Sequence, residues 1–435
     1  MIGPELQIII VFIVFLALLA VGMAVPFAIG VPALLYLVLI GGTQSLKGLG
    51  LVTFDSMNSF SLTSIPLFIL MAEIMQRSGL SHRVYTALAR LVCVIPGGLL
   101  QTNIAGCAMF AAVSGSSVAT AAAIGGVALP QLQARGYDPR LSAGSLAAGG
   151  TLGILIPPSI AMIIYGTFTE TSIAKLFIAG IVPGLVLTGL FMTYTAIHAL
   201  VKPGIAPRER GPANLRELFD ALLDLVPFVV LIGGTIGSLY VGIATPTEAA
   251  AVGCILATIG SVIWGGLSSK VLIGALDGCI RSCGNIMLIV FTAFVFSYAI
   301  SLGGVGEKLT TLLIKLDLAR WQFIIALFFF YTVLGALVES LGMIVITVPL
   351  LYPVLLKYHI DPVWFGIILV LFIELGQITP PIGINLFVIQ GLWTGKLGDV
   401  VLGTIPYHLL MFGMVGLLVL WPEIALWLPD HMTQR

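Results

Sequence analysis

The chain has little charge. Only 9% of its 435 residues are Asp, Glu, Lys or Arg, whereas 59% are hydrophobic, and the mean hydropathy is +1.13. Soluble globular proteins carry about a quarter of their residues as these four charged types, so the composition excludes an ordinary soluble enzyme and indicates a protein embedded in lipid. The formal net charge is zero and there is no basic run, which argues against nucleic acid as a partner.

Motifs for nucleotide binding, metal catalysis and phosphoryl transfer are also missing, so we expect no step driven by ATP. The cysteines number only five and show no C-x-x-C spacing. We therefore expect them to be small buried hydrophobic residues rather than a disulfide or metal set. They are Cys93, Cys107, Cys254, Cys279 and Cys283.

Long uncharged runs are abundant and define the organisation of the chain. A spanning helix needs about 20 apolar residues, and residues 6–46 are free of charge, which is enough for two short spans folded at Gly22. Ten further uncharged runs follow, and the only polar linker of any size, residues 202–217, lies at the middle of the chain. This position suggests an internal duplication.

A shift of 223 residues superposes the two halves. It places Asp138-Pro139 on Asp361-Pro362 and Pro157-Pro158 on Pro380-Pro381, and in all it matches six of the 13 prolines before residue 213 with prolines after residue 223. Chance at one fixed shift gives fewer than about one such match. The sequence therefore predicts two homologous halves.

Each half is expected to hold about five spans, a re-entrant hairpin and a broken helix. The run 91–134 is interrupted at residues 114–117, which leaves legs of roughly 24 Å, shorter than the roughly 30 Å hydrocarbon core. An odd number of spans per half turns the second half upside down. We therefore expect an all-α integral membrane protein with inverted repeats at residues 1–201 and 218–435, joined by a cytoplasmic linker at 202–217. The hairpins are expected at about 97–133 and 321–357, and the broken helices at about 140–167 and 362–392.

The basic residues favour a periplasmic N-terminus. With that orientation, twelve Lys and Arg residues fall on the inner side of the membrane and seven on the outer side. This bias has the sign of the positive-inside rule. The bias is modest because the second half is expected to be inverted. Its copy of the basic surface segment of the first half therefore lies on the opposite side of the membrane.

Four helix interruptions carry the functional argument. The hairpin tip at residues 114–117 is matched by residues 335–340, and the broken helix at residues 153–159 is matched by residues 376–383. Backbone leaves a helix inside a bilayer only where protein or a water-filled cavity surrounds it. Freed carbonyls and hydroxyls suit Na⁺, and the N-termini of half-helices suit an anion. The alternative is a set of packing kinks, which four breaks in inverted register disfavour.

Several motifs together resemble one family. They are Ser114-Gly115-Ser116, the run from Gly153 to Gly166 with its Pro pair, Thr245-Pro246-Thr247-Glu248-Ala249-Ala250, and Glu374-Leu375-Gly376-Gln377-Ile378-Thr379-Pro380-Pro381 with the Ile382–Phe387 run after it. The combination is similar to the large membrane subunit of tripartite ATP-independent periplasmic (TRAP) transporters and covers nearly the whole chain. The chain departs from many members at Thr120, where they carry Asp, and from some at Glu374, where they carry Asn.

The resemblance implies a Na⁺-coupled importer of a small organic acid in the bacterial inner membrane. It implies an elevator mechanism, a periplasmic substrate-binding protein and a small four-span membrane subunit, which we expect on a separate polypeptide. Carried over by position, the Na⁺ ligands are Ser114, Gly115, Gly153, Ile156, Gly335, Ser340, Gly376 and Thr379. The substrate cavity is expected to be lined by Ser116, Ser117, Pro158 and Pro381, with Glu374 beside it.

Ionisable residues inside the spans divide into structural and functional candidates. Glu73 with Arg77, and Asp277 with Arg281, have the spacing of ion pairs on one helix face. Thr245 and Glu248 have the spacing of a capping box. Glu339 and Glu374 lie beside the second pair of breaks and have no basic neighbour in sequence, so each either orients the site or satisfies backbone donors. His198 and His408 are expected to be structural hydrogen-bonding residues.

Two other functions compete with the importer. One is a stand-alone Na⁺/carboxylate symporter of related fold, which needs no binding protein. The other is an intramembrane hydrolase, because Ser114-Gly115-Ser116 loosely resembles a serine protease loop. A serine nucleophile needs a base within hydrogen-bonding distance, and neither spanning histidine lies on a recognisable motif with it.

Overall fold

The computed structural model describes residues 4–207, 209, 211, 212 and 214–432. Throughout this part of the chain the regular secondary structure is helical. Three basic residues that contribute to the charge bias, Arg208, Arg210 and Arg435, lie outside the described residues.

The chain begins with helices that are joined by short turns. α1 (Pro4–Ala20) and α2 (Val25–Gly41) meet at a turn where Gly22 has a φ of +85°, a conformation that glycine adopts without strain. The 3-10 helices η1 (Gly42–Gly48) and η2 (Phe60–Thr63) flank α3 (Leu49–Met57), and α4 (Ser64–Arg77) and α5 (Leu80–Val92) follow.

The remainder of the first half contains a helical hairpin and a broken helix. Its helices are α6 (Leu99–Ser114), α7 (Ser117–Ala134), α8 (Pro139–Gly150), α9 (Leu152–Leu155), α10 (Ile160–Thr169) and α11 (Ile173–Val201). The prolines at 157 and 158 lie between α9 and α10, because a residue without an N–H cannot continue the helical hydrogen bonds.

The second half of the chain begins after η3 (Pro203–Ile205). Its helices are α12 (Leu215–Tyr240), α13 (Pro246–Ile263), α14 (Ser269–Leu302), α15 (Val305–Lys315), α16 (Arg320–Gly335), α17 (Ser340–Lys357), α18 (Pro362–Gln377), α19 (Ile384–Leu392), α20 (Leu397–Leu420) and α21 (Glu423–Asp430). The second proline pair, Pro380-Pro381, lies between α18 and α19.

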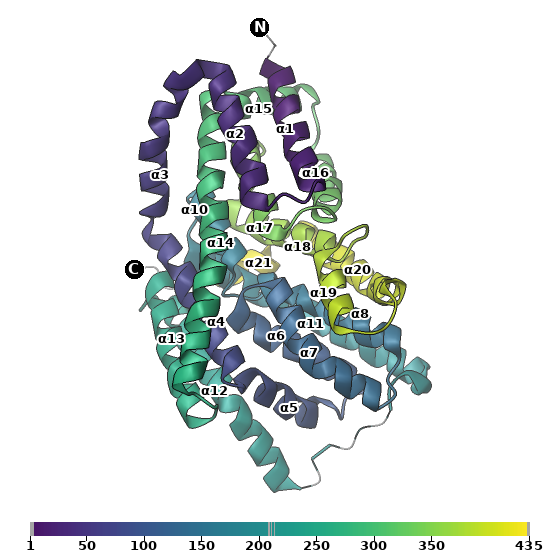
Figure 1. The fold of residues 1–435 in the computed structure, drawn as a ribbon. Helices are drawn as coiled ribbons and strands as arrows, with labels where there is room; N and C mark the ends of the chain where they lie inside the picture. Colours follow the sequence, from purple (N-terminus) through teal and green to yellow (C-terminus); the bar gives the residue numbers. More distant parts are fainter. Residues whose placement is uncertain (1–3, 208, 210, 213, 433–435) are drawn as a thin grey trace.

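We divide the helices into framework helices (α1–α5 and α12–α15) and core helices (α6–α11 and α16–α21). In the framework, α14 runs along most of the molecule and packs against α2 and α4, and α13 packs against α4 and α12 (Figure 1). In the core, α8 packs against α7 and α20, and α7 packs against α6 and α19. The hairpin tips and the broken helices all belong to the core helices.

Eight segments of the described chain are long and apolar enough to cross a membrane, from Val25–Met57 to Leu397–Leu420. They include α17, which the sequence predicts as a hairpin leg, and exclude α18, which is short but apolar. Large apolar side chains such as Leu409 and Ile263 are exposed on these helices, as expected where lipid is the solvent. The fold is that of a multi-pass membrane protein.

Local electrostatic predictions are confirmed. Arg77 pairs with Glu73 at 2.7 Å and Arg281 with Asp277 at 2.9 Å. Thr245 and Glu248 form the predicted capping box at the start of α13. These contacts could be predicted because each lies within one or two turns of a single helix.

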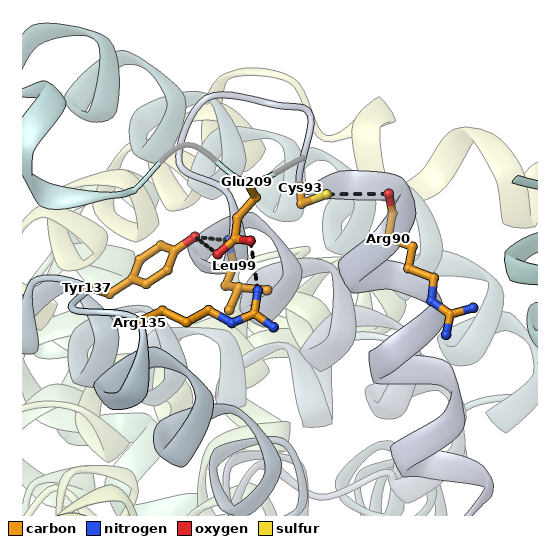
Figure 2. A network of polar contacts seen from close by, with 6 residues as sticks. All are labelled: Arg90, Cys93, Leu99, Arg135, Tyr137 and Glu209. Atoms are coloured by element: carbon orange, nitrogen blue, oxygen red, sulfur yellow. Dashed lines mark hydrogen bonds and ion pairs between the residues drawn. The ribbon is translucent and has the colours of Figure 1, made fainter. Parts of the chain in front are cut away.

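The linker between the halves is attached to both ends of the first hairpin. Glu209 accepts hydrogen bonds from Arg135 (2.7 Å) and from the Tyr137 hydroxyl (3.1 Å), and that hydroxyl accepts one from the N–H of Leu99 (3.0 Å) (Figure 2). Burial raises the pKa of Tyr137 well above its usual range, so the phenol remains a donor. One linker carboxylate therefore ties the start of α6 to the residues that follow α7.

Glu209→Ala is expected to lower the free energy of unfolding by about 1–3 kcal/mol, because the buried Tyr137 hydroxyl loses its acceptor. The loss of the Arg135 contact adds little, since that side chain is 48% exposed. The measurement is the unfolding midpoint of the purified protein in detergent. Asp220→Ala, at an exposed position on α12, is the matched control, and equal midpoints for the two variants would contradict the prediction.

Candidate functional site

The first hairpin tip lies directly against the first break. Gly115 has a φ of +59°, and a Cβ there would lie 2.7 Å from the carbonyl oxygen of Pro158. The N–H of Ile160, the first residue of α10, donates to the carbonyl of Gly115 at 3.4 Å. A larger residue than glycine therefore cannot occupy the tip without moving the break.

Hydroxyl groups and carbonyls gather where this tip meets α9. The hydroxyls of Ser114 and Thr120 share a hydrogen bond of 2.6 Å. A Cβ on Gly153 would lie 2.5 Å from the carbonyl oxygen of Ser116 and 2.7 Å from the Thr120 hydroxyl. The structure thus brings Ser114, Gly115, Ser116, Gly153 and Pro158 together. Thr120 belongs to this cluster, and sequence reasoning registered it only as a departure from the family pattern.

The second tip and the second break meet in the same way. A Cβ on Gly376 would lie 2.5 Å from the Cα of Gly335. The N–H of Ile382 donates to the carbonyl of Ala336 at 3.1 Å, and the Gln377 amide donates to the carbonyl of Val338 at 3.3 Å. The backbone of residues 335–338 therefore lies on the broken helix, although no motif in the sequence specifies these contacts.

Other predicted residues lie further from these contacts. The side chain of Ile156 packs against Gly184 of α11, which leaves only its carbonyl for a ligand. Pro158 is buried, whereas Pro381 is exposed. Ser340 is buried at the first position of α17, and its hydroxyl makes no hydrogen bond within the described part of the chain.

Glu374 connects the two halves of the site. It is fully buried, and neither carboxylate oxygen makes a hydrogen bond of standard geometry among the described residues, although the Ser117 hydroxyl lies beside it. Gln377 and Asn385 are also fully buried and carry side-chain atoms without partners in the same described region. Buried polar groups without partners are uncommon, so these three residues mark the second break as a functional region.

Thr379 has a neighbour that the sequence did not indicate. Its hydroxyl donates to the carbonyl of Leu375 at 2.6 Å, and Nε2 of His408 lies 3.2 Å from the same hydroxyl. Nδ1 of His408 lies 3.0 Å from the carbonyl of Thr404. His408 is thus a hydrogen-bonding residue, as expected. It also orients Thr379, a candidate Na⁺ ligand that lies 29 residues earlier in the chain.

The oxygen atoms at the two breaks fit a hard monovalent cation. Pro380 and Pro381 lack N–H groups, so the carbonyl of Gln377 has no helical donor, and the carbonyl of Ile156 likewise accepts no hydrogen bond within the described residues. Free carbonyls and hydroxyls are the ligands that Na⁺ takes at broken helices. Within the described part of the chain no group of three or more His, Cys, Asp or Glu could hold a metal ion.

A cavity of about 150 Å³ lies beside the first tip. Ser114 and Ser116 line it from the core helices, and Glu73, Gln76 and Ser282 line it from α4 and α14 of the framework. Sequence reasoning predicted the serines and missed the framework residues, because only the packing of α4 and α14 against the tip brings them there.

Paired breaks inside a bundle of apolar helices define the class of this protein as a multi-pass membrane transporter. The model of the tripartite ATP-independent periplasmic transporter family, DctM component, matches residues 12–424. The chain therefore belongs to this family, which confirms the resemblance of its motifs and excludes the hydrolase alternative.

Two relatives and one solved structure illustrate the relationship. The C4-dicarboxylate TRAP transporter large permease protein DctM of Rhodobacter capsulatus is 32% identical over 97% of this chain and 98% of its own length. The ectoine/5-hydroxyectoine TRAP transporter large permease protein UehC of Ruegeria pomeroyi is 35% identical over 85% of this chain and 86% of its own. The fold resembles that of the Alcanivorax borkumensis YdaH transporter, with a TM-score of 0.65, 17% identity and coverage of 88% of this chain and 90% of that one.

Proposed function

We propose that the chain is the permease subunit of a Na⁺-coupled transporter that imports a small organic acid across the bacterial inner membrane. The observation that carries the proposal is the contact of each hairpin tip with its broken helix, seen in the pairs Gly115 with Pro158 and Gly335 with Gly376. The cargoes named for the relatives, C4-dicarboxylates and ectoine, support a small carboxylate as substrate, and the proposed candidates are a dicarboxylate, a sialic acid or a similar carboxylate.

The proposed architecture is a pair of inverted repeats working as an elevator. In support, α7 and α17 are offset by the same 223 residues as the sequence repeat, and α8 and α18 both start at an Asp-Pro pair with this offset. The core helices would slide as a unit against the framework helices. With the N-terminus periplasmic, the linker at residues 202–217 is cytoplasmic.

The proposed Na⁺ ligands are the oxygens of the predicted residues. In the first half they are Ser114, Gly115, Gly153 and Ile156, and in the second half Gly335, Ser340, Gly376 and Thr379. Bound Na⁺ would supply positive charge beside the substrate carboxylate and couple uptake to the Na⁺ gradient. The substrate is held and enclosed by Ser116, Ser117, Pro158, Glu374 and Pro381.

The proposed partners are a periplasmic substrate-binding protein and a small four-span membrane subunit. The description of the family as tripartite supports both. The test is uptake of radiolabelled organic acids into proteoliposomes, with and without the binding protein and an inward Na⁺ gradient. Accumulation is expected only with both. Uptake without the binding protein would favour the stand-alone symporter, and uptake that ignores Na⁺ would contradict the coupling.

Thr379→Val is expected to lower uptake roughly fivefold at a Na⁺ concentration that half-saturates the wild type, because it removes a ligand oxygen worth about 1.4 kcal/mol and so weakens cation binding about tenfold. Higher Na⁺ should restore the rate. The control is Thr258→Val, whose hydroxyl makes the same kind of bond to a carbonyl four residues back, in α13. The same Na⁺ dependence in both variants would argue against Thr379 as a ligand.

A further inference from the structure

The cavity beside the first hairpin tip lies between the two groups of helices. Its volume is about 150 Å³. The core wall carries the hydroxyls of Ser114 and Ser116, and α4 and α14 form the opposite wall. A small solute bound here would contact both groups of helices at once.

The framework wall offers polar groups that have no partner. The amide of Gln76 and the hydroxyl of Ser282 make no hydrogen bond within the described residues; Gln76 is exposed and Ser282 is half-buried. Across the cavity, the Ser116 oxygen accepts from the N–H of Ala119 at 3.4 Å, and its own proton is uncommitted. These groups are accessible from the cavity and can form hydrogen bonds with a ligand there.

The framework presents the acidic end of an ion pair to the cavity. Glu73 lines the cavity, whereas its partner Arg77 does not and is 44% exposed. The carboxylate has room because position 278 is glycine, where a Cβ would lie 2.5 Å from Oε2 of Glu73. The arginine lies against Gly274, one turn further along α14. A solute therefore meets the carboxylate and not the guanidinium.

The core wall presents the opposite polarity. α7 begins at Ser117, next to Ser116, and α10 begins at Ile160, which also lines the cavity. The N-terminus of each helix carries partial positive charge, although the N–H of Ile160 donates to the carbonyl of Gly115 and the N–H of Ala119 donates to the Ser116 hydroxyl. An anion is favoured at the core wall, and a hydrogen-bond donor or a cation is favoured at the framework wall.

We propose that Glu73, Gln76 and Ser282 form the fixed wall of the substrate site. They select an organic acid that carries a hydroxyl or a protonated nitrogen at the end remote from its carboxylate. The inference rests on the proposed function and narrows its substrate class. A plain dicarboxylate would place its second carboxylate against Glu73, where like charges repel.

The test compares three probes that differ only at the far end: 4-aminobutyrate, 4-hydroxybutyrate and succinate. Their affinities for the purified wild-type permease in detergent, with saturating Na⁺, are measured from ligand-induced shifts of the unfolding temperature. Both monocarboxylates are expected to bind more tightly than succinate. Gln76→Ala and Ser282→Ala should each weaken their binding roughly tenfold. Asn285→Ala, at an exposed position one turn from Ser282, is the matched control and should bind like the wild type.

Glu73→Gln tests the selectivity directly. It keeps the size of the side chain and removes the charge, so the ratio of succinate affinity to 4-aminobutyrate affinity should rise roughly tenfold. An unchanged ratio would overturn the substrate class. Wild-type binding in both Gln76→Ala and Ser282→Ala, or no stabilisation of the wild type by any probe, would overturn the site itself. If these binding changes were observed but the reconstituted protein showed no Na⁺-driven uptake, the proposed transport function would be contradicted and the binding site would stand.

Discussion

Gly403→Ala is expected to destabilise the protein by about 1–3 kcal/mol or more. A Cβ at this position in α20 would overlap the carbonyl oxygen of Arg140 in α8, and a Cβ on Gly144 would overlap the backbone of Gly403. Neither helix can relieve the overlap by turning a side chain, because the colliding atoms belong to the backbone. The two helices would have to separate.

The consequence reaches beyond one contact because α8 and α20 come from different halves. Arg140 pairs with Asp399 at 2.8 Å, and further along Thr151 lies 3.9 Å from the sulfur of Met411. The two helices therefore run side by side in the same direction, with the glycines in between. Small residues allow such close approach in membranes, where packing replaces the hydrophobic effect as the driving force.

The measurement is the unfolding midpoint in detergent, together with the yield of monodisperse protein. Gly413→Ala is the control, because it lies in the same helix and a Cβ there meets nothing within 4 Å. The control should be neutral or more stable by up to about 1 kcal/mol, since alanine favours the helix. Equal stability of Gly403→Ala and Gly413→Ala would mean that the close contact does not support the fold.

The features that the sequence predicts are those controlled by the local backbone. Helices end at Leu155 and Gln377 because the proline pairs that follow cannot donate hydrogen bonds. The Glu73–Arg77 pair follows from a spacing of four residues. Features of this kind depend on residue type and spacing, and both can be read along the chain.

The features that could not be predicted depend on which helices become neighbours. Arg140 and Asp399 are separated by 259 residues, and His408 reaches Thr379 only because α20 packs against α18. The framework wall of the cavity is a similar case, since nothing near Ser282 in sequence indicates that it faces a hairpin tip. The proposed repeat relates equivalent positions in the two halves, but it does not specify contacts between them.

Gly153→Ala and Gly376→Ala are expected to lower Na⁺-dependent uptake about 5- to 150-fold, the factor that corresponds to an overpacking cost of about 1–3 kcal/mol at the site. A Cβ on Gly153 would press on the carbonyl of Ser116, and a Cβ on Gly376 would press on Gly335. Each substitution would push a hairpin tip away from its broken helix and spread the oxygens proposed to hold one cation.

The two variants also separate the two proposed cation sites. If each tip holds one Na⁺, uptake by the wild type should depend on Na⁺ concentration more steeply than uptake by either single variant, because each variant keeps one intact site. Gly126→Ala in α7 and Gly391→Ala in α19 are the controls, since a Cβ at these positions meets nothing within 4 Å. Wild-type rates and steepness in Gly153→Ala and Gly376→Ala would rule out the tips as the coupling sites. An effect in only one variant would restrict coupling to that half.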